Sequence, residues 1–255
     1  MKTIRLIVVV LFSMPGVVLS LVAYATEPVQ LPHQDWHFSG PLGTFDRASL
    51  QRGYMVYRRI CAACHSMKYI AFRNLEDIGY SEAQIKAIAA EYTYTDGPDE
   101  QGRMYERPGL PSDHFKSPFP NHNAARAVNN GALPPDLSLI IKARHQGPDH
   151  VYGILTGFEA APEGVVLRPG QFWNRYMPGH IIAMVPPLVE NMITYDDGTP
   201  QIVEQYARDV VTFLTWAAEP ILEDRKRAGL KVLIFLLVFT GIMYAIKERI
   251  WAAVR

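Results

Sequence analysis

The sequence predicts a mainly α-helical domain with long loops, followed by one C-terminal transmembrane helix. Residues 46–60 and 202–218 repeat apolar and aromatic side chains at the spacing of one helix face. Strand signals are few, and proline and glycine interrupt the connecting segments. Residues 232–246 carry no charge. These patterns favour a helical head on a single membrane anchor.

The two long helical segments share a candidate crossing point. Gly53, Tyr57 and Cys61 follow one another at intervals of four, which places them on one face of a helix. A glycine on such a face permits another helix to approach closely. Residues 202–218, which end before Pro220, are the candidate partner, although ordinary core packing gives the same periodicity.

Shorter helices are predicted between these two segments. Ser81 and Gln84 have the spacing of a capping box at the start of a helix over residues 82–92. Three further helices are expected to end at glycines: residues 124–130 before Gly131, residues 136–146 before Gly147, and a short helix capped by Asp149 that ends at Gly157.

Residues 1–25 are typical of a secretory signal peptide. They combine a basic start, a long apolar run and the tripeptide Ala23-Tyr24-Ala25. The segment lacks the Arg- and Ser-rich character of a mitochondrial transit peptide. We therefore expect bacterial export, with residues 26–222 forming a domain in the periplasm. An uncleaved N-terminal anchor is the alternative.

Residues 223–255 are predicted to hold the membrane anchor and a short cytoplasmic tail. Residues 228–246 contain one charged residue, Lys231, and at about 1.5 Å per residue they cover most of a hydrocarbon core roughly 30 Å thick. Basic residues flank this run almost equally on both sides, so the orientation in the bacterial inner membrane is inferred from the signal peptide. A buried helix of a soluble protein is the alternative.

The zero net charge is a sum of opposite contributions from different parts of the chain. Residues 26–222 contain 16 Lys and Arg against 22 Asp and Glu, a net charge of −6, whereas residues 223–255 contain 7 basic and 3 acidic residues, a net charge of +4. An acidic head disfavours nucleic acid and suits a basic protein partner, although acids also aid solubility. The acids are concentrated in two segments: Glu91, Asp96, Asp99, Glu100 and Glu106, and Glu190, Asp196, Asp197, Glu204 and Asp209.

The two cysteines of the chain lie in the stretch RRICAACH, at Cys61 and Cys64, with His65 directly after them. A thioredoxin-like dithiol would lie near a βαβ pattern, and a structural zinc site would need further paired ligands. The spacing C-x-x-C-H is that of haem attachment, in which both thiols form thioethers and the histidine becomes an axial iron ligand. We therefore predict one covalently attached haem c. A plain disulfide is the alternative.

A methionine opposite the histidine would give an electron-transfer iron of raised potential. Of the nine methionines, four are candidates by position: Met104, Met177, Met184 and Met192. Met184 lies in the apolar, proline-containing stretch IIAMVPP, which suits a soft thioether ligand, but Met177 also precedes a proline. The local sequence prefers Met184 only slightly, and a methionine that simply fills the core is the common alternative.

Four stretches, CAACHSMKYIAFRNL, NNGALPPDLSLIIKARH, MPGHIIAMVPP and DDGTP, resemble the cytochrome c1 family of haem subunits of the cytochrome bc1 complex. The similarity runs from about Trp36 to the C-terminal anchor. It implies a class I cytochrome c-like haem domain with His65 and Met184 as axial ligands. It also implies haem contacts from Asn129, Ala132, Pro134, Pro135, Tyr152 and Leu155, with Arg144 paired to a propionate.

The same resemblance implies a function. Such a chain would take single electrons from the Rieske iron–sulfur protein and pass them to a soluble cytochrome c, beside cytochrome b, as a subunit of quinol–cytochrome c oxidoreductase. The chain itself would carry electrons and make or break no substrate bond. Two alternatives remain open: a cytochrome that binds a small ligand at an open iron, and an anchored electron shuttle outside any complex.

Overall fold

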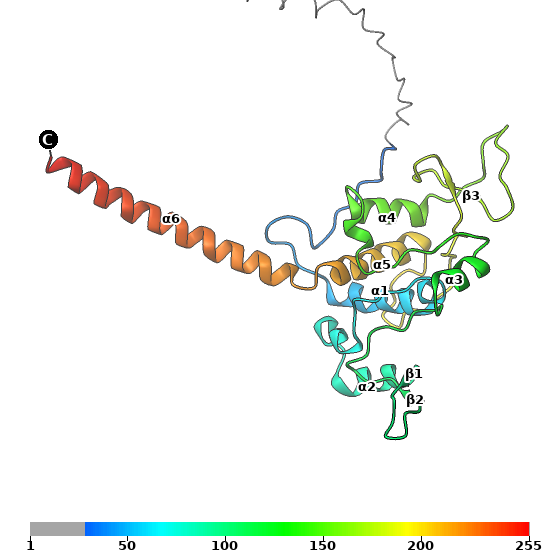
Figure 1. The fold of residues 1–255 in the computed structure, drawn as a ribbon. Coiled ribbons are helices and arrows are strands. Elements are labelled where there is room, and N and C mark those ends of the chain that lie inside the picture. The colour runs from blue at the N-terminus through cyan, green and yellow to red at the C-terminus, as the bar shows by residue number, and fades with distance from the viewer. Residues whose placement is uncertain (1–28, 255) are drawn as a thin grey trace, which may run out of the picture.

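Three helices form the centre of the head (Figure 1). α1 (Arg47–Arg59) and α4 (Gly147–Thr156) each pack against α5 (Val203–Ala218). This computed structural model describes residues 29–254, so the predicted signal peptide lies outside the described residues. The mainly helical fold and the helices expected over residues 46–60 and 202–218 are confirmed.

α1 and α5 cross at a glycine, as the spacing in α1 suggested. A Cβ atom on Gly53 would clash with the backbone carbonyl of Asp209 on α5. α1 begins directly after Asp46, whose carboxylate accepts hydrogen bonds from the backbone N–H groups of Ala48 and Ser49. The cap fixes where α1 starts, and the glycine fixes where α5 crosses it.

The hydrophobic core lies along this crossing and is largely aromatic. The ring of Tyr57 stacks on Phe115 at 5.9 Å between ring centroids, and Phe213 contacts both tyrosines of α1 at 5.6 and 5.7 Å. α5 is buried along most of its length, because it lies between α1 and α4. The largest fully buried side chains are Trp216, Tyr206, Phe72, Phe213, Leu50 and Met67.

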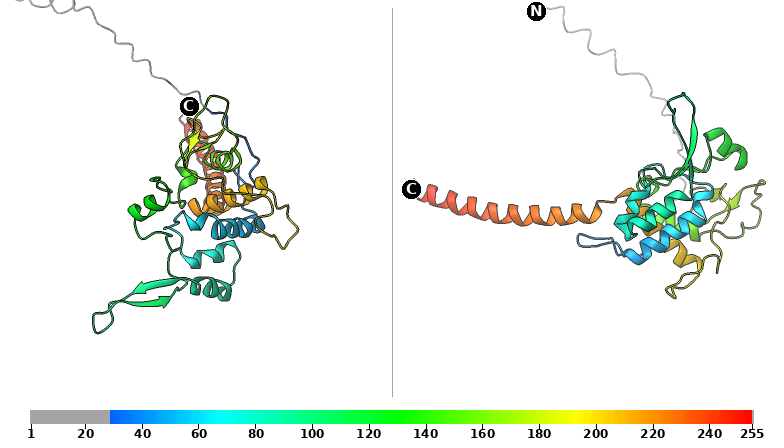
Figure 2. Two further views of the ribbon diagram at one scale, coloured as in Figure 1. Left: turned by 90° about the vertical axis from the view of Figure 1, so that its right-hand side faces the viewer. Right: turned by 90° about the horizontal axis from the view of Figure 1, so that it is seen from below.

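The remaining elements are short and are joined by long loops. The helices are η1 (Cys61–Ala63), η2 (Phe72–Ile78), α2 (Glu82–Ala90), α3 (His122–Val128) and η3 (Ile140–Lys142). The capping box predicted at Ser81 and Gln84 is present at the start of α2. Two antiparallel pairs complete the head: β1 (Thr93–Asp96) with β2 (Tyr105–Pro108), and β3 (Phe172–Trp173) with β4 (Ile181–Ile182). The β1–β2 hairpin projects from the body of the head (Figure 2).

The helix predicted over residues 136–146 is wrong. Only Ile140–Lys142 form a short 3-10 turn there, and α4 begins at Gly147 instead of a helix ending before it. A Cβ atom on Gly147 would clash with the carbonyl of Ile141, so this glycine marks a close approach between the turn and α4. Gly147 is therefore needed for close packing, because a side chain would not fit there, and it does not mark the end of a helix.

Asp149 does not cap α4 as predicted, although α4 does end at Gly157. The N-cap residue is Gln146, and Asp149 lies buried in the first turn. Its carboxylate accepts hydrogen bonds from the indole N–H of Trp36 at 2.7 Å and from the backbone N–H of Gln34 at 3.2 Å. The acid therefore ties the N-terminal segment of the head to α4.

α6 (Leu222–Ala252) extends away from the head as a single helix of 31 residues (Figure 1). Its most apolar window has a mean hydropathy of 2.2, and none of that window is buried inside the structure. At about 1.5 Å per residue the helix exceeds the roughly 30 Å of a hydrocarbon core. α6 is therefore long and apolar enough to cross a membrane, and the alternative of a buried helix is wrong.

The first turns of α6 are joined to the head by charged groups. The Glu223 carboxylate accepts from the backbone N–H of Phe45 at 2.7 Å and pairs with Arg47 at 2.9 Å. The Lys226 ammonium donates to the carbonyls of Phe38 at 2.6 Å and Gly43 at 2.9 Å. These bonds hold the base of the anchor helix against the N-terminal segment of the head.

Candidate functional site

The C-x-x-C-H stretch forms one tight turn at the end of α1. The carbonyl of Cys61 accepts from the backbone N–H of Cys64 at 3.0 Å and from that of His65 at 2.8 Å. α1 thus delivers the two thiols and the imidazole as one compact unit. Both cysteines are free thiols in the structure, so they form no disulfide.

The imidazole of His65 is held by one ring nitrogen. Its Nδ1 lies 2.8 Å from the carbonyl oxygen of Pro135, which can only accept, so Nδ1 carries the proton and donates. Burial lowers the pKa of the imidazole, although the Pro135 carbonyl and the Asp136 carboxylate act in the opposite direction. A neutral ring with Nδ1 engaged leaves Nε2 unprotonated, as a metal ligand must be.

The donor set fits a haem better than a thiolate-bound metal. Burial raises the pKa of the Cys61 thiol to about 12, so this thiol is neutral as long as no metal binds it, whereas zinc requires the thiolate. A thioether, by contrast, is neutral and needs no such charge. Within residues 29–254, no group of three or more His, Cys, Asp or Glu side chains is arranged to hold a metal ion.

A groove of about 750 Å³ lies beside the attachment turn. Cys64, Pro134 and Pro135 line one part of it, and the loop over residues 117–123 lines another. Two other predicted contact residues precede this proline pair. Asn129 and Ala132 are partly buried, and the backbone N–H of Ala132 donates to the Asn129 carbonyl at 2.9 Å. The structure thus brings Pro135, which lies within the NNGALPPD stretch, to His65.

The four candidate methionines differ in their surroundings. Met104 and Met192 are exposed, at 60% and 52% of their surface. Met177 and Met184 are both partly buried, and Met184 packs against the same hydrophobic core cluster as Cys61. Packing against the core favours Met184 over Met177, because a thioether ligand needs a dry, fixed place.

The other predicted haem contacts fall into two classes. Tyr152 and Leu155 lie on α4 and are buried in the core. Arg144 is exposed, and its Nη1 donates only to the neighbouring Ala143 carbonyl, at 2.9 Å. None of the ion pairs among the described residues involves Arg144. Its guanidinium is therefore free to pair with a carboxylate from outside the chain.

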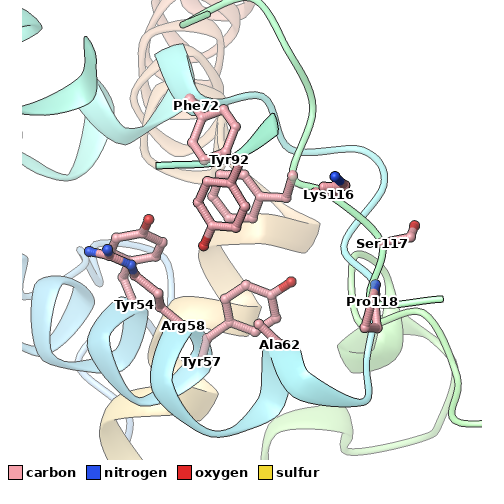
Figure 3. Close-up of a pocket in the computed structure, with 10 residues that line it drawn as sticks. Tyr54, Tyr57, Arg58, Ala62, Phe72, Tyr92, Lys116, Ser117 and Pro118 are labelled. Carbon is pink, nitrogen blue, oxygen red and sulfur yellow. The ribbon is translucent and has the colours of Figure 1, made fainter. Parts of the chain in front are cut away.

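A second, smaller hollow lies on α1 next to the attachment turn (Figure 3). It has a volume of about 220 Å³. In Figure 3, Tyr54 and Tyr57 on α1 and Ala62 on η1 face Phe72 and Tyr92 across it. Arg58 also lines it and forms an ion pair with Glu91. This hollow therefore lies over aromatic side chains next to the turn that carries the cysteines.

Comparison with known proteins decides the family. The model of the cytochrome c1 family matches residues 36–254, which is most of the chain. The chain belongs to the cytochrome c1 family. This family is the haem subunit of the cytochrome bc1 complex, and its task is electron transfer. α6 fits the transmembrane helix of a single-pass member.

Cytochrome c1 proteins from bacteria and mitochondria are similar over nearly the whole chain. "Cytochrome c1" of Rhodospirillum rubrum is 45% identical over 259 residues, covering 94% of this chain and 95% of that protein. "Cytochrome c1, heme protein, mitochondrial" of Saccharomyces cerevisiae is 47% identical, covering 91% of this chain and 75% of that protein. "Cytochrome b/c1" of Bradyrhizobium diazoefficiens is 51% identical over 87% of this chain, but the chain spans only 35% of that protein's length.

Fewer side chains of the two acidic segments are available to a partner than the sequence suggests. Five of the ten acids form ion pairs: Glu91 with Arg58, Asp96 with Arg107, Asp99 with Arg103, and both Asp197 and Asp209 with Arg52. Asp209 is fully buried and cannot face a partner. The other five are exposed and have no ion pair within the described part of the chain: Glu100, Glu106, Glu190, Asp196 and Glu204. Arg52 and Arg58 lie far from the acidic segments in sequence, Arg107 follows the first segment directly, and only Arg103 lies within it, so the local pattern does not show most of these ion pairs.

Sequence reasoning also missed the side chain next to Pro135. Asp136 is partly buried, and its carboxylate accepts from the Ser66 hydroxyl at 2.7 Å. The sequence pattern predicts Asp136 only as part of the helix over residues 136–146. Asp136 follows two prolines, which have no backbone N–H to donate. This Pro-Pro-Asp sequence is a signal that the acid orders a turn.

Proposed function

We propose that this cytochrome c1 carries one covalently attached haem c, bound through Cys61 and Cys64, with His65 and Met184 as the axial ligands of its iron. The observation that carries this proposal is the 2.8 Å contact between His65 Nδ1 and the Pro135 carbonyl. That contact fixes the tautomer and leaves Nε2 unprotonated and able to bind a metal. The burial of Met184 against the core supports its role as the second ligand.

Bound haem supplies a one-electron carrier whose iron shuttles between two oxidation states. The chain's own part is to hold that group and shield it. Tyr152 and Leu155 offer buried apolar contact, and Asn129, Ala132, Pro134 and Pro135 form the loop on the His65 side. We assign a haem propionate to Arg144, because its guanidinium has no ion pair among the described residues and a guanidinium binds a carboxylate through two parallel hydrogen bonds.

The same proposal extends to partners and place in the cell. The chain takes electrons from the Rieske iron–sulfur protein and delivers them to a soluble cytochrome c, within a quinol–cytochrome c oxidoreductase that also contains cytochrome b. Residues 26–222 form the periplasmic head, after removal of residues 1–25, and residues 223–255 anchor it in a bacterial inner membrane. The family and the relatives named above support the complex, and α6 supports the anchor.

One purification tests both parts of the proposal. The full-length protein is expressed in its membrane, extracted in mild detergent and affinity-purified. A pyridine haemochrome spectrum of the c type that survives acid-acetone extraction is expected, because thioether-linked haem does not dissociate. Co-purification of a b-type haem protein and an iron–sulfur protein is expected for the complex.

The control is a variant in which Cys61 and Cys64 are both replaced by serine. It should lose the covalent haem, since serine hydroxyls do not form the thioethers. Extractable haem in the native protein would refute covalent attachment. A haem-loaded chain that purifies alone under several mild detergents would favour the free-standing electron shuttle instead.

A further inference from the structure

The segment that carries Pro135 is bonded side by side to the segment that follows His65. The backbone N–H of Leu137 donates to the Ser66 carbonyl at 2.8 Å. The backbone N–H of Tyr69 donates to the hydroxyl of Ser138 at 3.1 Å, and Ser138 is fully buried. Two stretches about 70 residues apart in sequence are thus held in a fixed register.

The Asp136 carboxylate is the centre of this arrangement. One of its oxygens accepts from the Ser66 hydroxyl at 2.7 Å and from the backbone N–H of Lys68 at 3.0 Å. The other accepts from the backbone N–H of Ser138 at 2.9 Å. One charged side chain therefore binds both segments and closes the turn after the prolines.

Pro135 itself has no N–H with which to hold its own position. The place of its carbonyl, and hence of the His65 hydrogen bond, depends on its neighbours in the chain. Asp136 is the next residue, and its carboxylate is bonded directly to Ser66 and Lys68, which follow His65. A shift of this carboxylate would move the acceptor that orients the imidazole.

We propose that Asp136, together with Ser66, is a positioning device for the imidazole of His65. The pair holds the Pro135 carbonyl at the distance and angle that orient the ring and strengthen its donation to iron. The inference rests on the proposed haem ligation by His65. It follows because the hydrogen bond made by a ligating histidine tunes both its orientation and its basicity.

The test compares two conservative variants of the full-length, haem-loaded protein. Asp136→Asn keeps the shape of the side chain but replaces one accepting oxygen with an amide group that cannot accept. Ser66→Ala removes one partner and leaves the charge of Asp136 in place. Each should shift the midpoint potential of the haem and the g values of the oxidised protein in electron paramagnetic resonance.

The chain offers a matched control at the start of α1. Asp46 also accepts from a serine hydroxyl, that of Ser49 at 2.7 Å, and from two backbone N–H groups. Asp46→Asn and Ser49→Ala remove bonds of the same kind at the opposite end of α1 from the attachment turn. They should lower the unfolding temperature and leave the potential and the g values unchanged.

Three results would overturn the inference. The first is an unchanged potential and unchanged g values in both Asp136→Asn and Ser66→Ala. The second is a shift in Asp136→Asn alone, which would mean that the acid acts only through its charge. The third is an equal shift in the Asp46 and Ser49 controls. If Asp136→Asn fails to fold, Ser66→Ala alone decides. A native protein without covalent haem would overturn the proposed function first, and this is measured before any variant.

Discussion

The backbone carbonyl of Asp209 on α5 occupies the space that any side chain on Gly53 of α1 would need. The carboxylate of the same aspartate is fully buried and is bonded to Arg52 at 2.9 Å. One residue of α5 therefore meets two consecutive residues of α1, through its backbone at one and its side chain at the other. This crossing holds together the helix that ends in the attachment turn and the helix that leads to the anchor.

Gly53→Ala should destabilise the head by about 1–3 kcal/mol, because the added methyl group forces the two helices apart in a packed core. Thermal unfolding of the haem-loaded protein, followed by circular dichroism, measures the loss. Gly229→Ala on α6 is the control, since no atom lies within 4 Å of a Cβ there. Equal stability of native protein and Gly53→Ala would show that the crossing is looser than the structure indicates.

Met184→Leu should leave the haem attached through the two cysteines but lower its potential and open the iron to carbon monoxide. The reason is that leucine has the size of methionine but no ligand atom. Redox titration and the carbon monoxide difference spectrum measure the two effects. Met177→Leu is the control and should change neither. The reverse pattern, with Met177→Leu altering both, would assign the ligand to Met177.

Asp197 should contribute stability that disappears in acid. Hydrogen bonds from Thr199, followed by the bond to Arg52, lower the pKa of its carboxyl to about 2. Because this is below the ordinary value for an aspartate of about 3.9, the contribution is present above that value and is lost as the pH falls toward 2. Asp197→Asn should therefore unfold at a lower temperature than the native protein. The difference should be constant near neutral pH and decrease below about pH 4.

The neighbouring Asp196 provides the control for this pH dependence. It is exposed, and none of the hydrogen bonds or ion pairs among the described residues involves its side chain. Asp196→Asn should give a small, pH-independent difference. A gap for Asp197→Asn that stays the same down to pH 2 would contradict the prediction.

The stability of a soluble head should depend on the residue of α6 after which the chain is truncated. A chain that ends after Arg227 keeps both Glu223 and Lys226, whereas one that ends after Glu223 loses the two bonds from the ammonium to the carbonyls of Phe38 and Gly43. The shorter form should be less stable by about 1–3 kcal/mol, as expected for hydrogen bonds that involve a charged donor. Chemical denaturation of the two released heads measures the difference.

Lys226→Met in the longer truncation separates the ammonium from the length of the chain. It should reproduce the loss of the shorter form, because only the charged head group is removed. Both truncations should leave the membrane fraction, since each lacks the apolar part of α6. A truncated head that stays in salt-washed membranes would point to an uncleaved N-terminal anchor.

Exposed acidic side chains that have no ion pair should attract a basic electron acceptor and raise its association rate. Glu100→Lys with Glu106→Lys should slow reduction of a basic soluble cytochrome c several-fold at low salt, with little change in haem potential. Salt should reduce the difference, because the Debye length is about 10 Å at 0.1 M. Stopped-flow kinetics over a range of ionic strength measures it. Asp99 is left intact because its carboxylate holds the turn at Arg103.

Glu163→Lys is the comparison for this double variant, because it reverses the charge of a single exposed acid in another loop. It should affect the rate less than the double variant does. Rates that respond to neither salt nor charge reversal would leave the acids a role in solubility only.

Much of this protein was determined by short-range patterns in its sequence. The spacing C-x-x-C-H, the glycine four residues before Tyr57, the capping box at Ser81 and the uncharged run at the C-terminus each predict a local feature that depends on neighbouring residues alone. The turn at Cys61–Ala63, α1, α2 and α6 follow from those patterns, because backbone hydrogen bonds and side-chain periodicity act over one or two helical turns.

Only the tertiary structure decided which polar groups meet across long sequence separations. The pairing of Asp209 with Arg52, of Asp136 with Ser66, and of Lys226 with the carbonyl of Phe38 each joins residues that no local pattern connects. The error at residues 136–146 has the same origin. The segment had helical signals, but its acid is bonded to the chain after His65 and its glycine is needed for close packing, and these contacts outweigh a helix propensity that is weak for each residue.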